Sequence, residues 1–554
     1  MKRLVLAFVL VLLCSISFSQ IRIDWQQCYG SFGMDYSCGI AKKEGGYWVA
    51  GYVEEQSGMV AIQVPYWSWA IEIDDVGNLK KQIELGCYAR QCEDFFKAYS
   101  GEYYFATGLP PNELGKEQLG IKKIDDNGDV IWETMVGNKD YGFWENALGN
   151  CTSDGGAIAT TPTMWSGGDI TNYYGMYDAW VVKVDSLGNL EWETTLGTDR
   201  FEEATSFTLT SDGGYYVTII GCPGYTGSIP VCHLPSTDEY DCILVKLDSE
   251  GNLLWSRCYG GSKHDGFNNV LELEDGFLLA CYTESEDRDA EGAGYHFGYY
   301  HDMPYLGQTN DIWLIRTDAD GNIIWSRCYG GTGMEFPTKA FLNEDGGFTV
   351  FGTTQSIDGD AQSAQNLYAP TPYDEYVYHK LWLFRIDSDG NLLWERAIGT
   401  KMHTNIYLDD VVKLSDTEYT ILATAHPPAA GCEGDFNCTN WDDRLCGYES
   451  YWVLHITDIF DYDGVEELQT GKIGINVYPN PATTWVAFDY TLPGDAEKAT
   501  LTLTNALGVK VAAYNLSGNQ GQKVLDLREF ANGVYTITVL CGEYYQTVKL
   551  VITK

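Results

Sequence analysis

Short segments in which apolar residues alternate with polar ones, or form brief apolar runs, fill most of the chain and come in pairs. Residues 178–184 (DAWVVKV) and 311–317 (DIWLIRT) are examples, and each precedes a turn rich in Asp, Gly and Asn and then a further apolar run. A period of two predicts β-strands, and a Gly between two strands predicts a tight hairpin because glycine adopts positive φ at no steric cost. The pattern therefore predicts an all-β protein built from hairpins.

Two kinds of hairpin alternate along the chain. The first has the turn D-x-x-G-N or a close variant and starts at residues 125, 185, 248, 318 and 387, with a degenerate copy at 74 that carries Lys81 where the others carry Trp. The second occurs seven times, starting at residues 39, 97, 147, 206, 269, 339 and 411. Two halves of the first kind lie at opposite ends, residues 25–30 (WQQCYG) and 451–458 (YWVLHITD). Joining them completes a seventh unit and closes a ring, which predicts a seven-bladed β-propeller over residues 20–460.

The Trp that follows each first turn has a counterpart in known proteins. D-x-x-G-N-x-x-W resembles the tryptophan-docking repeat of quinoprotein-type propellers, although its Asp-to-Gly spacing differs by one residue. The resemblance implies that these Trp side chains lock neighbouring blades together, and it carries over no quinone because the chain lacks an adjacent Cys-Cys pair. The predicted structural docking residues are Trp25, Trp132, Trp192, Trp255, Trp325 and Trp394.

The N-terminal residues have the pattern of an export signal. Residues 1–19 combine Lys2 and Arg3 with an apolar run and a small-x-small site, which is typical of a signal peptide. No later stretch approaches roughly 20 apolar residues, so we predict no transmembrane segment.

The formal net charge of -43 argues against nucleic acid as a partner, because phosphate binding requires clustered Lys and Arg.

The C-terminal part has a different composition. After a linker at 461–474, residues 475–554 contain motifs in an order that resembles the type A C-terminal sorting domain of the type IX secretion system of Bacteroidetes. The resemblance implies a small immunoglobulin-like β-sandwich that the type IX machinery recognises, and a protein that is extracellular or attached to the cell surface. The matching residues are Tyr478, Pro479, Asn480, Pro481, Gly508, Gly533, Val534, Tyr535 and Lys549.

The long insertions are predicted to share one face of the ring, opposite the short turns. They are rich in Tyr, Trp and His beside carboxylates, which suits sugar rings and protein hot spots alike, whereas Tyr-rich loops also pack against one another. The leading hypothesis is a secreted binding or adhesion propeller whose ligand is a glycan or a protein. Its candidate ligand-binding residues are Tyr295, His296, Tyr299, Tyr300, His301, Tyr373, Tyr376, Tyr378 and Trp441.

Two other functions stay open. A polysaccharide-degrading enzyme would use acidic loop residues such as Glu284, Glu286 and Asp287, although no catalytic motif is present and no catalytic residue is predicted. A structural component of the cell surface is the third hypothesis. The D-x-D-G-N stretches have the composition of calcium loops but lack the downstream Glu, so we predict turns, no metal site and no cofactor.

Removal of the signal peptide with Cys14 would leave fifteen of the sixteen cysteines, and two groups stand out among them. Cys28, Cys258 and Cys328 share one repeat position, where we predict small buried side chains. The clusters Cys222, Cys232, Cys242 and Cys432, Cys438, Cys446 lie in irregular segments of an exported protein, where we predict cross-links.

Overall fold

The computed structural model divides the chain into two compact units, residues 1–460 and 461–554, and each is described by itself. It describes residues 21–30, 35–53, 67–85, 94–97, 101–109, 118–138, 147–222, 224–229, 239–298, 309–367, 378–400, 405–425, 450–458, 473–492, 499–505, 510–516, 520–528, 530–541 and 544–554.

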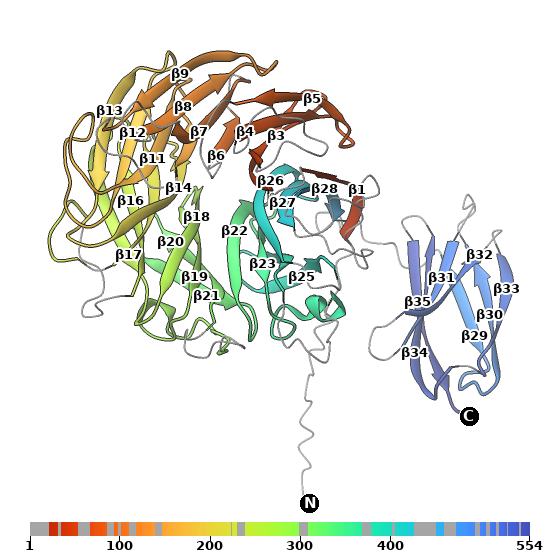
Figure 1. The fold of residues 1–554 in the computed structure, drawn as a ribbon. Coiled ribbons are helices and arrows are strands. Elements are labelled where there is room, and N and C mark those ends of the chain that lie inside the picture. Colours follow the sequence, from red (N-terminus) through yellow and green to blue (C-terminus); the bar gives the residue numbers. More distant parts are fainter. Residues whose placement is uncertain are drawn as a thin grey trace, which may run out of the picture. The chain divides into compact units, whose positions relative to one another are not determined.

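The described residues of the first unit form seven four-stranded antiparallel sheets, numbered here as blades 1 to 7, which follow one another around a ring (Figure 1). Blade 1 contains β2 (Asp35–Lys43), β3 (Gly46–Val53), β4 (Trp67–Ile73) and β5 (Leu79–Glu84). Blade 2 contains β6 (Asp94–Lys97), β7 (Tyr103–Leu109), β8 (Gln118–Ile124) and β9 (Val130–Val136). Blade 3 contains β10 (Leu148–Cys151), β11 (Ala157–Thr163), β12 (Asp178–Val184) and β13 (Leu190–Leu196).

The remaining blades have the same order of strands. Blade 4 contains β14 (Glu202–Leu209), β15 (Tyr215–Gly221), β16 (Asp241–Leu247) and β17 (Leu253–Tyr259). Blade 5 contains β18 (Asp265–Leu273), β19 (Gly276–Thr283), β20 (Asp311–Asp318) and β21 (Ile323–Tyr329). Blade 6 contains β22 (Glu335–Leu342), β23 (Phe348–Thr354), β24 (Lys380–Ile386) and β25 (Leu392–Ile398). Blade 7 contains β26 (Ile406–Ser415), β27 (Glu418–Ala425), β28 (Ser450–Asp458) and β1 (Ile21–Tyr29).

Blade 7 closes the ring with strands from both ends of the unit. β1 pairs antiparallel with β28, so that Trp25 lies opposite His455 and Tyr29 opposite Tyr451. The first strand of blade 1, β2, contacts β26 of the same closing blade. The propeller predicted from the two half-hairpins is therefore confirmed.

The D-x-x-G-N turns have the predicted conformation. Their glycines have φ between +79° and +84°, as at Gly390 and Gly188. In the turn at 318, Asp318 Oδ1 accepts hydrogen bonds from the backbone N–H groups of Asp320 and Asn322, at 3.0 and 2.8 Å. Its Oδ2 accepts the Asn322 amide at 2.9 Å. The Asp is thus a turn residue whose oxygens are engaged locally, and within the described parts of the chain no three His, Cys, Asp or Glu residues are grouped to hold a metal.

The repeated Trp side chains lie at the junctions between blades. Three of them donate their indole Nε1–H to a backbone carbonyl in the D-x-x-G turn of the next blade: Trp132 to Ser186 at 2.9 Å, Trp192 to Ser249 at 3.1 Å and Trp325 to Ser388 at 3.1 Å. Trp25 lies under Gly77 in the same manner, since a Cβ at Gly77 would stand 2.8 Å from its ring. Trp255 packs against Tyr216 and Phe277.

Trp394 differs from the other members of this series. It is buried, and its Nε1 has no hydrogen-bond partner among the residues that the structure describes. The next blade is blade 7, where the third and fourth strands come from opposite ends of the chain. No continuous turn joins them, so the carbonyl that receives the indole at other junctions has no counterpart here.

The repeated CYGG segment forms a second contact between blades. Tyr259 and Tyr329 donate their hydroxyls to the turn glycines of the following blade, Gly321 O at 2.9 Å and Gly390 O at 2.6 Å. The residue after Tyr329 is Gly330, and the Glu335 carboxylate lies so close to its backbone that a Cβ there would stand 2.3 Å from a Glu335 oxygen. This crowding explains why the position is a glycine. The motif therefore recurs because it builds the same junction each time.

The cysteines differ from their predicted roles. Cys28 and Cys258 are disulfide-bonded, as is Cys38, so the prediction of simple buried thiols was wrong for these two repeat positions. Cys328 is a buried thiol, as predicted. Cys222 and Cys242 are thiols and not cross-links. Cys242 belongs to strand β16 and packs in the core between blades. Cys232, Cys432, Cys438 and Cys446 lie outside the described residues.

The second unit consists of two sheets packed around one cluster of buried residues, which makes it a β-sandwich. Its classification as immunoglobulin-like stays a prediction. One sheet contains β29 (Gly474–Tyr478), β30 (Trp485–Thr491) and β33 (Gln520–Asp526). The other contains β32 (Lys510–Leu516), β31 (Ala499–Asn505), β34 (Gly533–Cys541) and β35 (Tyr544–Ile552). Among the described residues, no helix has the length and hydrophobicity to span a bilayer.

Candidate functional site

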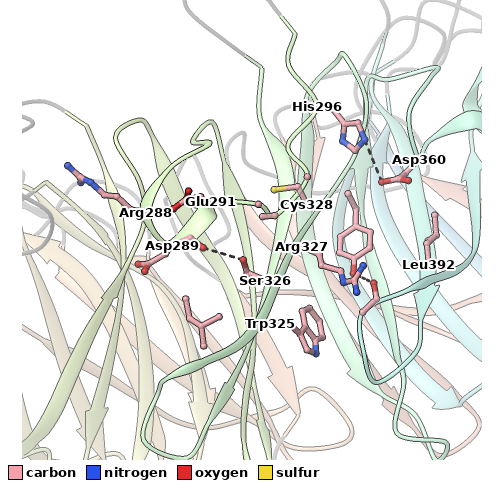
Figure 2. Close-up of a pocket in the computed structure, with 16 residues that line it drawn as sticks. Arg288, Asp289, Glu291, His296, Trp325, Ser326, Arg327, Cys328, Asp360 and Leu392 are labelled. Atoms are coloured by element: carbon pink, nitrogen blue, oxygen red, sulfur yellow. Dashed lines mark hydrogen bonds and ion pairs between the residues drawn. The ribbon is translucent and has the colours of Figure 1, made fainter.

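A pocket of about 840 Å³ opens between blades 5 and 6 and is called here the blade 5–6 pocket (Figure 2). Three elements line it. The first is the segment 288–296, which includes the short 3-10 helix η1 (Arg288–Ala290). The second is strand β21, and the third consists of Asp360, Gly390 and Leu392 from blade 6. The short helix η3 (Gln362–Leu367) begins two residues after Asp360.

The segment 288–296 is held in place by contacts with both neighbouring blades. Arg288 has a left-handed backbone (φ 56°) and donates to Gly261 O at 2.7 Å, while the Asp289 carboxylate accepts the N–H of Gly260 at 3.1 Å. On the other side, Ser326 donates its hydroxyl to the backbone oxygen of Asp289 at 3.2 Å, as Figure 2 shows. The wall of the pocket is therefore fixed by hydrogen bonds to blades 4 and 5.

His296 is oriented by a buried carboxylate. Its Nδ1 lies 2.9 Å from Asp311 Oδ2, and its backbone N–H donates to the same oxygen at 2.8 Å. Because that carboxylate accepts at Nδ1, the other ring nitrogen is directed at Asp360, whose Oδ2 lies 4.0 Å away (Figure 2). The hydrogen bond with Asp311 raises the pKa of His296.

Buried carboxyl groups surround this histidine. Burial raises the pKa of Asp311 to about 6 and that of Glu335 to about 7, and it also raises the pKa of Asp360. Asp311 Oδ1 has no hydrogen-bond partner within the described residues. The pocket thus has an imidazole and a carboxylate on one side, with Arg288, Arg327 and the exposed Glu291 elsewhere on its lining.

Only part of the predicted ligand-binding set can be placed. Tyr295 donates its hydroxyl to Thr309 O and packs against the core between blades 4 and 5, and His296 lines the pocket. Tyr378 lies before β24 and does not line the pocket. The other predicted residues lie outside the described part of the chain: Tyr299, Tyr300, His301, Tyr373, Tyr376 and Trp441.

Sequence reasoning missed most of the pocket. It did not single out four of the lining residues: Arg288, Ser326, Arg327 and Asp360. Ser326 and Arg327 belong to the repeated WSRC segment, so the sequence indicated a structural role for them. A difference between repeats was the available signal: where β21 has WSRC, β13 and β25 have WETT and WERA. The predicted docking residue Trp325 also lines the pocket, so one side chain contributes to the blade junction and to this cavity.

The acidic residues considered for catalysis have different environments. Burial raises the pKa of Glu284 to about 7, and the neighbouring Glu239 raises it further. Asp287 accepts the backbone N–H of Ser262 at 2.8 Å, which makes it part of the loop structure. Glu286 is exposed. Glu284 therefore has the raised pKa that a general acid requires.

The motif residues of the second unit largely hold the sandwich together. Asn480 donates its amide to Lys549 O at 2.6 Å and accepts the N–H of Val551 at 2.9 Å, which ties the segment after β29 to the last strand. Pro479 and Pro481 both follow cis peptide bonds directly after β29, an edge strand, as expected for residues without a backbone donor. Tyr478 is exposed and accepts a hydrogen bond from Gln522 at 2.7 Å.

The other sorting residues lie on β34 and β35. Gly533 pairs with Ile552, and Lys549 pairs with Thr536 across these two strands. Val534 is exposed, and Tyr535 donates to Ala531 O at 2.9 Å. Gly508 lies outside the described residues.

Comparison with known families identifies this second unit. Residues 476–553 match the family described as secretion system C-terminal sorting domain. The chain is therefore a β-propeller protein with a type IX sorting domain, exported to the cell surface or the extracellular space, and its sequence is consistent with an origin in Bacteroidetes. No curated protein matches the chain significantly.

Solved structures match the chain at low identity. The β-propeller domain of the Trilobed protease from Pyrococcus furiosus is 10% identical, with 78% of this chain and 97% of that chain covered and a TM-score of 0.40. An acylaminoacyl peptidase from Pyrococcus horikoshii is 11% identical over 84% of this chain, which spans 59% of the peptidase (TM-score 0.36). A member of the duf4221 family from Bacteroides vulgatus is 8% identical, with 80% and 99% covered and a TM-score of 0.31. These likenesses are too remote to indicate an activity.

Proposed function

We propose that this exported propeller is a glycan-binding protein and that the blade 5–6 pocket is a binding site. The lining of the pocket carries the proposal. It combines the partly exposed indole of Trp325 with the side chains of Arg288, Glu291 and Asp360 around about 840 Å³. That volume suits a ligand of one to three sugar rings, since small-molecule sites typically measure roughly 300–1,000 Å³.

The chemistry of these groups fits a sugar. A pyranose ring presents an apolar C–H face, which packs on an aromatic ring, and hydroxyls that both donate and accept hydrogen bonds. Carboxylates such as Glu291 accept from hydroxyls, and guanidinium groups such as that of Arg327 donate to them in a fixed geometry. Because segment 288–296 is already hydrogen-bonded to blades 4 and 5, the site loses little conformational entropy when a ligand binds.

A matched pair of variants on one loop tests this proposal. Glu291 lines the pocket, whereas Glu286 is also exposed and does not line it. A glycan array with the full exported protein identifies the ligand, and titration calorimetry then measures its affinity. Glu291→Ala is expected to weaken binding by about tenfold, the effect of losing one charged hydrogen bond, while Glu286→Ala leaves it unchanged. Equal affinity for both variants, or no glycan bound at all, would refute the proposal.

A polysaccharide-degrading enzyme is the second candidate, and Glu284 favours it. Its pKa of about 7 would keep this carboxyl protonated near neutral pH, as a general acid in glycoside hydrolysis requires. Incubation with a panel of polysaccharides tests this candidate. Release of reducing ends that Glu284→Gln abolishes would support it, and no release from any polymer would exclude Glu284 as such an acid.

A further inference from the structure

The insertions between the second and third strands of blades 3 to 6 are fastened to the preceding blade by one recurring pair of hydrogen bonds, called here the latch. Each latch joins a residue of the insertion to the glycine that follows the outer strand of the preceding blade. The glycine N–H donates to the side chain of the insertion residue, and the glycine carbonyl accepts that residue's backbone N–H. The four latches are Gly137–Asp169, Gly197–Ser228, Gly260–Asp289 and Gly330–Asp360.

The latch between blades 5 and 6 has an additional partner. The N–H of Gly330 lies 3.4 Å from Asp360 Oδ2, whereas the corresponding distances at Asp169 and Asp289 are 2.9 and 3.1 Å. The same Asp360 oxygen lies 4.0 Å from Nε2 of His296, which belongs to the insertion of blade 5 (Figure 2). Asp360 therefore contacts both the latch glycine and the imidazole of the neighbouring insertion.

The orientation of His296 is fixed from its other side. Its backbone N–H and its Nδ1 contact the same oxygen of Asp311, at 2.8 and 2.9 Å, and Asp311 is fully buried at the start of β20. The charged groups that face the ring come from three elements: Asp311 on β20, Glu335 on β22 and Asp360 on the insertion of blade 6. All three are carboxyl groups, and each favours the protonated imidazole when it is ionised.

From this arrangement we propose that His296 and Asp360 form a proton-dependent clasp, which joins the insertions of blades 5 and 6 at the blade 5–6 pocket. Both residues line the pocket, so the closed clasp holds two of its walls together. A site held in this way loses less conformational entropy when a ligand binds. Resting on the glycan-binding function proposed above, this inference adds its regulation: the pocket binds its glycan more tightly when His296 is protonated.

The direction of the pH dependence follows from the contacts of both residues. The hydrogen bond with Asp311 raises the pKa of His296 above 6.5, so the clasp is largely closed at pH 6.5 and opens as pH rises through the folded pKa. Burial raises the pKa of Asp360, so the clasp is also lost in strong acid. The two side chains are 31% and 30% exposed, and ion pairs of this kind are weak, so we expect affinity to change about threefold between pH 6.5 and pH 9.

Histidine-selective NMR titration of the full exported protein tests the clasp without a ligand. The chain has eight histidines, and His296→Gln identifies the resonance of His296. Asp360→Asn is expected to lower the proton affinity of His296 about threefold, because it removes the facing charge. Asp169→Asn is the matched control and leaves this affinity unchanged, since Asp169 forms the same latch in blade 3 and bonds to no histidine in the described part of the chain. Equal proton affinity of His296 in wild type and Asp360→Asn would overturn the inference.

Titration calorimetry at pH 6.5 and pH 9, with the glycan identified on the array, tests the effect on the pocket. Wild type and Asp169→Asn are expected to bind about threefold more tightly at pH 6.5, and Asp360→Asn binds equally at both pH values. Because Asp360 lines the pocket, the ratio of the two affinities is compared, and not the affinity itself. An unchanged ratio in Asp360→Asn would show that His296 acts on the ligand directly, and the clasp would be rejected.

The two experiments separate this inference from the proposed function. If Asp360→Asn leaves His296 unaffected, the inference fails and the glycan-binding function stands. If no glycan binds at either pH, the proposed function fails together with the effect on affinity, while the NMR titration still decides whether the clasp forms.

Discussion

Asp265 is a sensitive probe of how this propeller tolerates buried acids. It starts strand β18 and is 0% exposed. Its Oδ2 accepts the N–H of Gly261 at 2.6 Å and the hydroxyl of Ser285 at 3.0 Å, and the Thr283 hydroxyl donates to its other oxygen. Burial raises its pKa from 3.8 to about 7, and the nearby Asp241 adds to the effect.

The sign of the pH dependence follows from this shift. Between pH 4 and 7 the folded protein keeps a proton on Asp265 that the unfolded chain has released. Stability therefore falls as pH rises through this window and levels off above the folded pKa. With about 1.4 kcal/mol for each tenfold change in proton affinity, the loss from this residue between pH 5 and pH 8 is roughly 2.5 kcal/mol. For a unit of about 440 residues this corresponds to a change in Tm of roughly 3 °C.

Differential scanning calorimetry of wild type and Asp265→Asn at pH 5 and pH 8 measures this effect. The variant loses hydrogen bonds at both pH values, so its Tm relative to wild type isolates the titration. We expect that difference to shift by roughly 3 °C in favour of the variant at pH 8. Asp212→Asn is the control: hydrogen bonds with Lys246 and Thr210 lower the pKa of Asp212 to about 2, so it is ionised throughout the window. A difference for Asp265→Asn that stays constant from pH 5 to pH 8 would show that this carboxyl is not protonated in the folded state.

Two further substitutions probe the blade junctions and the sorting domain. Tyr329→Phe removes the hydroxyl that donates to Gly390 O between blades 5 and 6, so it should lower stability by about 1 kcal/mol and the Tm of the propeller transition by roughly 1 °C. The control Tyr225→Phe changes an exposed side chain and should leave Tm unchanged. Equal Tm values for both variants would contradict the junction role of Tyr329. Asn480→Ala breaks both hydrogen bonds to the last strand, so the exported fraction of the protein, measured by immunoblot, should drop at least severalfold. The control is Asn476→Ala, at an exposed residue of the same unit. Full export of Asn480→Ala would refute a structural role for this motif residue.

The fold was predictable because its information is local and repeated. Each turn shows its Gly at positive φ, each strand its alternation, and each junction its Trp or Tyr, so every copy supports the others. Closure of the ring was also predictable, since the halves at Trp25 and Tyr451 match two parts of one hairpin. The disulfides of Cys28 and Cys258 were not, because bonding depends on the distance between two side chains and the repeat position records only one of them.

The blade 5–6 pocket could not be derived in this way because it arises from an exception to the repeat. Ser326 is unremarkable within its own segment, and it becomes informative only when β20 and β21 are set in register and Trp313 is found opposite Cys328. The 3-10 turn that covers the pocket depends on hydrogen bonds to Gly260 and Gly261 in the preceding blade, which no local pattern encodes. A repeat protein thus shows its scaffold in what its copies share, and it shows candidate sites where one copy lacks a partner that the others retain. In this chain Trp313 is such an exception, because its indole N–H has no hydrogen-bond partner among the residues that the structure describes.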